Sequence, residues 1–329
     1  IYFIGSILIE KAGFLDKITI FSNMVVFSSY GMQVIMSFLM LAMIFMIWPR
    51  AQVSARRINE ILDCNISIKD GDVKNGTSVG TVEFKNVSFK YPDAMEYILE
   101  DISFKVNKGE TVAFIGSTGS GKSTLINLVP RFYDVTLGEV LVDGVNVKDY
   151  EQYSLNNKIG YVSQKAVMFT GSILDNVRYG DSGTDITIDK IKEAIDVAQG
   201  TEFVSKMSDT YKSHISRGGT NISGGQKQRL SIARAIAKSP EIYIFDDSFS
   251  ALDYKTDLTL RTELKKYTKD ATCLIVAQRI GTIMNADKII VLDKGKCVGI
   301  GTHKQLLKNC EVYKQIALSQ LSKEELEDE

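Results

Sequence analysis

Nine consecutive residues of the chain have the composition and spacing of a phosphate-binding loop. They read GSTGSGKST and fit the pattern G-x-x-x-x-G-K-[ST], between a β-like run, ETVAFIG, and a helix-like run, LINLV. Glycines at these positions let backbone N–H groups close around phosphate oxygens, and the N-terminus of the following helix adds a favourable dipole. We expect Lys122 to reach the β- and γ-phosphates of a nucleotide and the Ser123 hydroxyl to ligate Mg²⁺. The residues expected around the phosphates are Gly116, Ser117, Thr118, Gly119, Ser120, Gly121, Lys122, Ser123 and Thr124.

A second run of residues supplies carboxylates for such a site. Residues 241–247 read EIYIFDD, an apolar strand-like run that ends in two acidic residues. A buried strand that ends in this way delivers its carboxylates to the carboxyl edge of an open α/β sheet, where ligands bind. We therefore predict that Asp246 is the carboxylate on the Mg²⁺ side of the site.

The most specific stretch lies between these two runs. Residues 221–230 read NISGGQKQRL and continue into the helix-like run SIARAIA. This stretch closely resembles the signature motif of ABC ATPases, in which leucine is usual at the position of Ile222. The resemblance covers the chain from Val82 to about Lys314. It implies an α/β P-loop NTPase fold of the ABC type, with a RecA-like core, an antiparallel β subdomain and a helical subdomain over about 165–238. In this family the signature residues contact the nucleotide of the partner chain, and here they are Ser223, Gly224, Gly225 and Gln226.

The same resemblance assigns roles to residues whose spacing alone would leave them unassigned. Tyr91, in FKYPD, matches the aromatic residue on which adenine stacks, and Gln164, in YVSQK, matches the Q-loop glutamine. In the family that glutamine contacts Mg²⁺ and links the nucleotide site to the membrane domain. Residues 250–253, which read SALD, match the D-loop. The implied cofactors are ATP and Mg²⁺, with Ser123, Gln164 and Asp246 around the metal.

Two positions depart from the pattern of the family, and both concern hydrolysis. The residue after the Mg²⁺-side aspartate is normally a glutamate that polarises the attacking water, and here it is Asp247. A side chain one methylene shorter withdraws the carboxylate by about 1 Å, which can cost on the order of a hundredfold in rate. The switch histidine of the family is replaced by Gln278, whose amide donates a hydrogen bond but carries no positive charge. With Gln164 these residues form the predicted catalytic group, and we expect a site that binds ATP well and hydrolyses it slowly.

ABC ATPases act as dimers in which each nucleotide lies between the phosphate-binding loop of one chain and the signature of the other. The signature here is nearly consensus, whereas Asp247 and Gln278 are not. We therefore favour a heterodimer with a second half-transporter whose active site this chain completes, as in the degenerate-site subunits of bacterial multidrug-type exporters. Two alternatives stay open: a homodimer that uses Asp247 as its catalytic carboxylate, and a regulatory nucleotide-binding membrane subunit that never hydrolyses ATP.

The first fifth of the chain has the composition of a membrane segment. Residues 18–48 carry no charge, and a bilayer core needs about 20 apolar residues in a helix. Residues 1–9 are interpreted as the tail of a preceding transmembrane helix, and residues 51–63 as a helical extension into the cytoplasm. The cytoplasmic side is indicated by an excess of arginine after the span, at Arg50, Arg56 and Arg57.

These patterns predict three parts. Residues 1–64 form the C-terminal part of an all-α transmembrane domain, residues 65–80 a linker rich in Ser, Asp, Asn and Gly, and residues 81–329 the ABC nucleotide-binding domain. A membrane helix ahead of the ATPase matches the exporter arrangement and argues against a non-transport ABC ATPase. We expect a multi-pass protein of the cell membrane with its ATPase in the cytoplasm. Its partners would include membrane lipid and a transported small molecule, lipid or peptide, which the sequence does not identify.

The composition excludes other classes of function. The 329 residues carry a formal net charge of −1, which argues against nucleic acid as a partner. The four cysteines are scattered without a CxxC pair, and both histidines are isolated, so that neither residue type predicts a metal site. We interpret the cysteines as free thiols in a reducing compartment.

Overall fold

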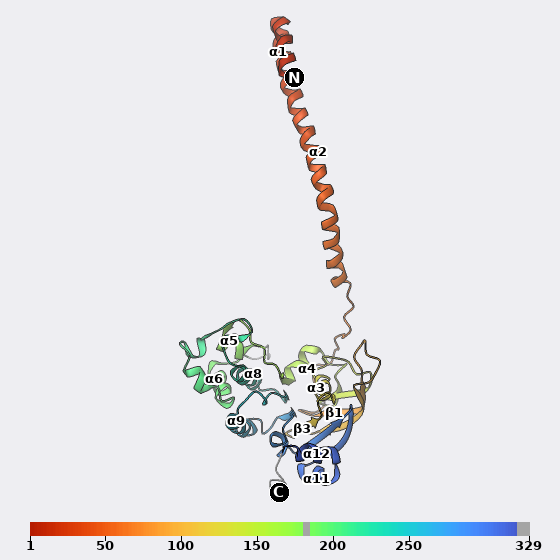
Figure 1. The fold of residues 1–329 in the computed structure, drawn as a ribbon, viewed down its shortest axis with the longest axis vertical. Coiled ribbons are helices and arrows are strands. Elements are labelled where there is room, and N and C mark those ends of the chain that lie inside the picture. The colour runs from red at the N-terminus through yellow and green to blue at the C-terminus, as the bar shows by residue number, and fades with distance from the viewer. Residues whose placement is uncertain (180–184, 321–329) are drawn as a thin grey trace. The chain divides into compact units, whose positions relative to one another are not determined.

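The computed structural model describes residues 1–179 and 185–320 of the chain (Figure 1). Parts of two predicted regions, 180–184 of the helical subdomain and 321–329 of the nucleotide-binding domain, lie outside the described residues. By its contacts the chain divides into two units, Ile1–Ser67 and Ile68–Glu329. The division falls within the predicted linker, and most of that linker belongs to the second unit.

The first unit consists of two helices, α1 (Tyr2–Lys11) and α2 (Phe14–Leu62). Helix α1 packs closely against the first part of α2. Gly5 of α1 is buried there, and a Cβ atom at this position would lie 2.3 Å from the Met24 sulfur. A residue larger than glycine would therefore have to displace the Met24 side chain or separate the two helices.

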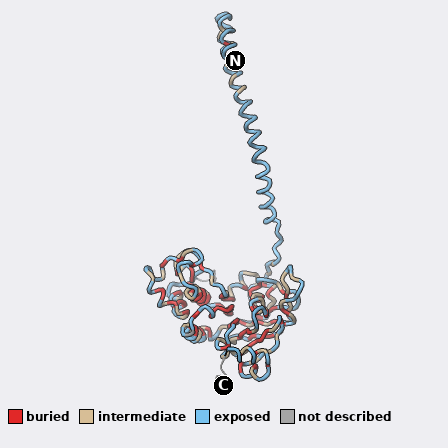
Figure 2. Tube along the Cα trace, viewed as in Figure 1, coloured by how far each residue is buried: buried red, intermediate tan, exposed pale blue. Residues whose placement is uncertain are grey.

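Helix α2 is the element that could cross a membrane. It has 49 residues, about 74 Å of helix, whereas a bilayer core is about 30 Å thick. It is the only helix among the described residues that is long and apolar enough to span, with a mean hydropathy of 2.0 in its most apolar window and no buried residue in that window. Its residues are exposed almost throughout (Figure 2). The predicted span and its helical extension form one continuous helix, with Pro49 inside it.

A six-stranded sheet forms the centre of the second unit, in the order β12-β11-β3-β10-β9-β6 (Figure 1). Neighbouring strands are parallel except for the edge strand β12, which runs antiparallel to β11. The strands are β3 (Thr111–Gly116), β6 (Ile159–Val162), β9 (Ile242–Asp246), β10 (Thr272–Val276), β11 (Lys288–Asp293) and β12 (Lys296–Gly301).

This sheet is buried on both faces, as parallel sheets usually are. Along β3, Ala113 and Ile115 point into one hydrophobic core, and Val112 and Phe114 into the other. The same alternation holds for β9 and β10, whose residues are all buried. This double burial explains why these strands are continuous apolar runs in the sequence.

An antiparallel sheet covers one of the two cores, in the order β2-β1-β4-β5. The Phe104 ring stacks on Phe84 within this sheet, with ring centroids 4.6 Å apart, and meets Phe114 of β3 edge-on at 5.6 Å. These rings join the two sheets. The strands are β1 (Val82–Phe89), β2 (Leu99–Val106), β4 (Leu137–Val142) and β5 (Val145–Asn146).

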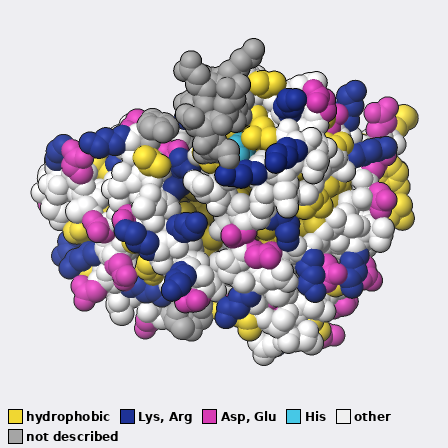
Figure 3. Space-filling model, turned by 90° about the horizontal axis from the view of Figure 1, so that it is seen from below, with side chains coloured by type: hydrophobic (Ala, Val, Ile, Leu, Met, Phe, Trp, Pro, Cys, Tyr) yellow, Lys and Arg dark blue, Asp and Glu magenta, His cyan; other side chains and the backbone are white. Residues whose placement is uncertain are grey.

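The other core lies largely under a group of helices, within the region 165–238 that the sequence predicts as helical. These are α5 (Ile173–Arg178), α6 (Ile188–Val197), α7 (Thr201–Ser205) and α8 (Gly224–Lys238), with a short ribbon of β7 (Gly171–Ser172) and β8 (His214–Ile215). The remaining helices are α3 (Lys122–Asn127), α4 (Gln152–Lys158), α9 (Tyr254–Tyr267), α10 (Ile280–Ile283), α11 (His303–Asn309) and α12 (Glu311–Leu318). On the face of this unit drawn in Figure 3, lysine and arginine side chains are interspersed with aspartate and glutamate, as is typical of surfaces that face water.

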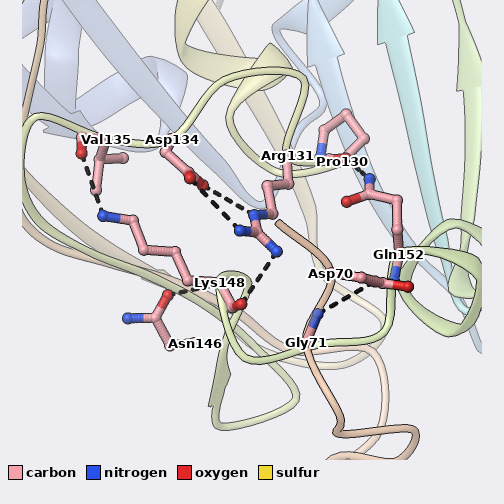
Figure 4. A network of polar contacts seen from close by, with 9 residues as sticks. All are labelled: Asp70, Gly71, Pro130, Arg131, Asp134, Val135, Asn146, Lys148 and Gln152. Carbon is pink, nitrogen blue, oxygen red and sulfur yellow. Dashed lines mark hydrogen bonds and ion pairs between the residues drawn. The ribbon is translucent and has the colours of Figure 1, made fainter. Parts of the chain in front are cut away.

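Residues 68–80, called the strap below, lie along the segment that leads into α4. The Gly71 and Val73 amides donate hydrogen bonds of 3.1 and 3.0 Å to the carbonyls of Tyr150 and Asp149. The Asp70 carboxylate accepts a 2.6 Å hydrogen bond from the backbone amide of Gln152, the first residue of α4 (Figure 4). The strap is therefore attached to the beginning of α4 by backbone groups.

A buried ion pair fixes the end of the strap. Asp143 is fully buried and accepts hydrogen bonds of 2.9 Å from the Thr81 amide and from Lys158 Nζ. Lys158 Nζ also lies 3.0 Å from a carboxylate oxygen of Glu241. Burial alone would lower the pKa of Lys158, but the hydrogen bonds and charges of the two carboxylates outweigh it and raise the pKa. The lysine therefore stays charged near neutral pH.

We expect Lys158→Met to destabilise the second unit by about 2–3 kcal/mol, because it leaves the Asp143 carboxylate buried without a cation. This loss of stability is smaller than the loss usual when a fully buried ion pair is broken, because the Glu241 side chain is 35% exposed. The measurement is the thermal unfolding midpoint by calorimetry, which should fall by several degrees for a unit of this size. Lys206→Met is the matched control: its pair with Glu202 is exposed to water on both sides and should contribute little to stability. Equal shifts for the two variants would contradict this account of the ion pair.

Candidate nucleotide site

The predicted phosphate-binding loop connects the end of β3 to the start of α3. Its backbone takes left-handed conformations at Gly119 (φ 81°) and Gly121 (φ 94°), which side chains with a Cβ atom rarely adopt. A Cβ at Gly121 would also lie 2.7 Å from a methyl group of Leu99. The loop therefore requires glycine at these two positions. Its conformation brings the loop and the first residues of α3 around the same cavity.

Lys122 begins α3 and turns back over this loop. Its Nζ donates hydrogen bonds of 2.9 and 2.8 Å to the carbonyls of Gly116 and Ser117. The side chain is 8% exposed, and this burial lowers its pKa, although the charges of Asp246 and Asp247 act in the opposite direction. The arrangement places a cation at the mouth of the loop, where phosphate oxygens can replace the carbonyls as its partners.

Asp246 ends β9 directly opposite α3. One of its carboxylate oxygens accepts a 2.8 Å hydrogen bond from Ser123 Oγ, and the other lies 3.4 Å from the Tyr161 hydroxyl. Tyr161 also donates a 2.8 Å hydrogen bond to the Asn127 side chain. Burial raises the pKa of Asp246, partly offset by these two hydroxyls and by Lys122. Two predicted Mg²⁺ ligands, Ser123 and Asp246, thus already share a hydrogen bond.

Asp247 is held by two glutamines from neighbouring strands. Gln164 follows β6 and donates a 3.0 Å hydrogen bond to Asp247 Oδ2, while Gln278 follows β10 and donates one of 2.7 Å to the same oxygen. The Asp247 backbone is left-handed (φ 46°), a conformation that aspartate tolerates better than most residues. The three predicted catalytic residues therefore meet at one carboxylate oxygen.

A cavity of about 350 Å³ lies against these groups. Its lining brings together Tyr91, Lys122, Gln164, Asp247 and Gln278, with other residues of the loop. The Tyr91 hydroxyl lies 3.1 Å from the Thr124 hydroxyl, so the ring stands at the edge of the loop as expected for an aromatic platform.

The signature residues are not part of this lining among the described residues. Ser223 caps α8, accepting from the Gln226 amide at 3.3 Å, while the Gln226 side chain accepts from the Ser223 amide at 2.9 Å. Gly224 and Gly225 form the first turn of that helix.

Two residues that the sequence did not single out connect the site to its surroundings. Tyr161 links Asp246 to Asn127 of α3, and the Gln228 side chain of α8 donates a 3.2 Å hydrogen bond to the Ser163 carbonyl, next to Gln164. The position of Tyr161 in the strand that precedes Gln164 was the only available signal. Gln228 lies within the signature stretch 221–230, but its contact with Ser163, 65 residues away in the chain, left no signal in the sequence.

Comparisons with known proteins agree with this geometry. The profile of the ABC transporter family matches residues 99–250. The chain is 43% identical over 303 residues to an uncharacterized ABC transporter ATP-binding protein of Mycobacterium bovis, covering 91% of this chain and 52% of the relative. It is 43% identical over 248 residues to a putative multidrug export ATP-binding/permease protein of Bacillus subtilis, covering 75% of this chain and 42% of the relative. The chain thus spans about half the length of the curated relatives it matches.

A solved structure with a similar fold is that of a bacterial Atm1-family ABC exporter with ATP bound. The TM-score is 0.83 at 30% sequence identity, over 92% of this chain and 53% of that one. Together these matches confirm the predicted fold class: an ABC-type P-loop NTPase fold preceded by an N-terminal helix.

We expect Asp246→Asn to raise the melting midpoint of the protein measured in EDTA without nucleotide. The pKa of the Asp246 carboxyl is higher in the folded protein than in the unfolded chain. The folded protein therefore loses stability as the pH rises through the range between these two pKa values, and the ionised carboxylate is unfavourable at neutral pH. Asparagine removes the charge and keeps an oxygen for Ser123. With saturating MgATP, the wild-type protein should gain about 2.7 kcal/mol at a hundredfold excess over Kd, and the variant should lose most of this gain.

The exposed Asp270 provides the control, and Asp270→Asn should change neither midpoint. A lower midpoint for Asp246→Asn in EDTA would contradict the cost assigned to the buried charge.

Proposed function

This chain carries the ATP-binding domain of an ABC transporter, and on that premise we propose that it is the nucleotide-binding subunit of an exporter whose own ATP site hydrolyses slowly. The observation that carries this proposal is the pair of glutamine amides that converge on Asp247 beside an otherwise intact phosphate-binding loop. ATP binding and its hydrolysis depend on different groups of residues here, and only the second group departs from the family.

ATP binding is supported by the loop residues 116–124, with Lys122 as the cation for the β- and γ-phosphates. Tyr91 lines the same cavity, with its hydroxyl against Thr124, and would stack on adenine there. A cavity of about 350 Å³ is within the ordinary range for small-molecule sites.

Mg²⁺ fits the residues that remain. Ser123, Gln164 and Asp246 offer oxygens at the edge of the loop, too few for a protein-only cage but suited to Mg²⁺, which also takes phosphate and water ligands. The bound ion would neutralise the phosphate charges during phosphoryl transfer. No cluster of three or more His, Cys, Asp or Glu residues occurs within 1–179 and 185–320, which agrees with a metal that arrives with the nucleotide.

Hydrolysis requires a water molecule aligned with the γ-phosphorus, whose attack breaks the bond to the bridging oxygen and releases ADP and phosphate. Asp247 is the carboxylate that would orient this water and accept its proton. Its short side chain and its two amide donors hold the carboxylate oxygen close to the sheet. Gln278 would donate a hydrogen bond to the γ-phosphate without adding charge. Slow turnover follows from both features.

The signature of this chain then has its main role in a second chain. Ser223, Gly224, Gly225 and Gln226 open α8 with their amides, outside the cavity of their own chain. An anion at such a helix start is stabilised by the amides and the helix dipole. We favour a heterodimer in which these residues complete the active site of a partner half-transporter, over a homodimer that relies on Asp247.

Export across the cell membrane completes the proposal. Helix α2 is long and apolar enough to span, its arginines follow the apolar part, and the relative from Bacillus subtilis is named as a multidrug export ATP-binding/permease protein. The protein would be multi-pass, in contact with lipid, with the ABC unit in the cytoplasm. ATP would favour the closed form of two such units, and hydrolysis at the partner site would reset them. The transported compound, whether small molecule, lipid or peptide, is set by residues outside this site.

A regulatory subunit that never hydrolyses ATP is the second candidate. The observation that favours it is again Asp247, which is shorter than the glutamate usual in the family and whose Oδ2 already accepts two hydrogen bonds. Such a subunit would respond to ATP binding alone, and ATP-dependent conductance without turnover would distinguish it from an exporter.

Restoring the residues of the family should restore hydrolysis. We expect the double variant Asp247→Glu, Gln278→His to release phosphate from ATP on the order of ten- to a hundredfold faster than the wild-type protein, since it moves the carboxylate outward by about 1 Å. ATP affinity should stay the same, because Lys122, Ser123 and Asp246 are unchanged. The measurement is steady-state phosphate release by the full-length protein, alone and with any chain that co-purifies.

Asp247→Asn is the matched control and should abolish the remaining turnover of this site. Wild-type turnover as fast as that of the double variant would identify Asp247 as a competent catalytic carboxylate and would favour the homodimer.

Purification from the native host should identify the partner. We expect an affinity-tagged full-length protein to co-elute, in equal amount, with a second half-transporter that carries glutamate and histidine where this chain has Asp247 and Gln278. Mass spectrometry of the eluted complex makes the measurement. Recovery of this chain as its own sole partner would instead support the homodimer.

A further inference from the structure

The last described residue of the chain contacts the turn that carries Gln278. Gln320 Nε2 donates a 2.7 Å hydrogen bond to the Gln278 carbonyl, and Gln320 Oε1 accepts a 2.8 Å hydrogen bond from the Ile280 amide. One side-chain amide thus holds the backbone on both sides of Arg279. Forty-two residues separate the two segments, so this contact is a feature of the tertiary structure.

The two backbone groups need such a partner. Ile280 is the first residue of α10, and Arg279, its N-cap, makes no capping hydrogen bond with its side chain. The first amides of a helix have no acceptor within the helix. Gln320 therefore caps α10 although it is distant in the chain. Its two hydrogen bonds connect the turn 278–280 to the segment that carries Gln320.

Gln320 is held by the central sheet. It follows α12 directly, and its backbone amide donates a 3.0 Å hydrogen bond to the Ala317 carbonyl. Helix α12 buries Tyr313 and Ala317 completely and packs against β11 and β3. Strand β3 leads into the phosphate-binding loop. The turn 278–280 and this loop are thus fixed to the same rigid element.

The side chain of Gln278 is exposed, unlike the backbone contacts that hold it in place. Its amide lies 2.7 Å from Asp247 Oδ2 at the wall of the nucleotide cavity. A glutamine side chain has several rotatable bonds, so the position of its amide group depends on where its backbone is fixed. A shift of this turn would move the amide relative to both Asp247 and a γ-phosphate.

We propose that Gln320 is a positioning residue of the ATP site, which acts through Gln278 by fixing the backbone on both sides of Arg279. This rests on the proposed function, in which Gln278 donates a hydrogen bond to the γ-phosphate. Gln320 itself contacts no nucleotide. Its effect is confined to ligands that have a γ-phosphate, because the loop residues that bind the other phosphates do not depend on the turn 278–280.

The test compares equilibrium binding of AMP-PNP and of ADP, each with Mg²⁺, to the full-length protein. Gln320→Ala should lower the preference for AMP-PNP over ADP about two- to tenfold, the range that a lost hydrogen bond commonly gives. The affinity for ADP and the melting midpoint should stay near the wild-type values, because the Gln320 side chain is exposed. Gln278→Ala should lower the preference similarly, and the double variant should be no weaker than Gln278→Ala alone.

Two further variants sharpen the assignment. Gln320→Glu keeps an acceptor for the Ile280 amide but places a carboxylate against the Gln278 carbonyl, so it should reproduce the loss seen with Gln320→Ala. Gln315→Ala is the matched control, because Gln315 lies on α12 and its side-chain amide contacts Glu311 at 3.5 Å, remote from the turn. It should leave both affinities unchanged.

The remaining outcomes separate this proposal from the function on which it rests. If Gln278→Ala lowers the preference for AMP-PNP and Gln320→Ala does not, the positioning role is wrong and the proposed function stands. A parallel loss of ADP affinity in Gln320→Ala would indicate a general structural role and would also overturn it. If Gln278→Ala leaves the preference unchanged, the role of Gln278 at the γ-phosphate fails, and the positioning role fails with it.

Discussion

Two adjacent carboxylates, Asp246 and Asp247, are buried at the end of one strand, and most of the site is arranged around them. Only 5% and 8% of these residues is exposed. Burial and mutual repulsion both disfavour two neighbouring charges, so each carboxylate needs donors of its own. The order of the strands in the sheet places these hydrogen-bond donors around the two carboxylates. Strand β9 lies between β6 and β10, so that Gln164 and Gln278, which follow these two strands, reach Asp247 from opposite sides. The α3 side of the sheet provides Ser123 for Asp246.

This electrostatic arrangement explains why the two departures from the family belong together. A histidine at position 278 could become positively charged beside a carboxylate, and its pKa would then depend on that neighbour. Glutamine donates the same kind of hydrogen bond at any pH and leaves the carboxylate its full charge. The shorter Asp247 keeps its oxygen within 2.7 Å of that amide. The result is a pair of neutral amide donors at one oxygen of the Asp247 carboxylate, in place of a donor that could carry a positive charge.

The sequence predicted the parts of the site that depend on local pattern. The loop 116–124, the strand before Asp246 and the cap of α8 each have a short-range signature, because glycines, apolar runs and capping residues act on their own neighbours. The meeting of Gln164 and Gln278 at one oxygen depends on strand order, which the family resemblance implied and residue spacing alone did not.

Other features left no such signal in the sequence. The strap 68–80 has the polar composition of a linker, yet its backbone and two of its side chains, Asp70 and Thr77, make hydrogen bonds to residues 143–152 of the same unit. Gln320 is an ordinary glutamine in the sequence, and its role at the turn 278–280 exists only in the folded chain.

The strap is the part of the second unit that follows α2 in the chain, and its contacts lead toward the candidate nucleotide site. The chain runs from α2 through the strap, which is bonded to the start of α4, and α4 leads directly into β6. Strand β6 carries Tyr161 beside Asp246 and is followed by Gln164 beside Asp247. A displacement of the strap would therefore act on β6, which carries Tyr161 and leads to Gln164, through backbone hydrogen bonds, the Asp70 side chain and the ion pair of Lys158. Coupling in this sense needs two alternative positions of the strap with different affinities for ATP, since a ligand shifts only an equilibrium between states that it binds unequally.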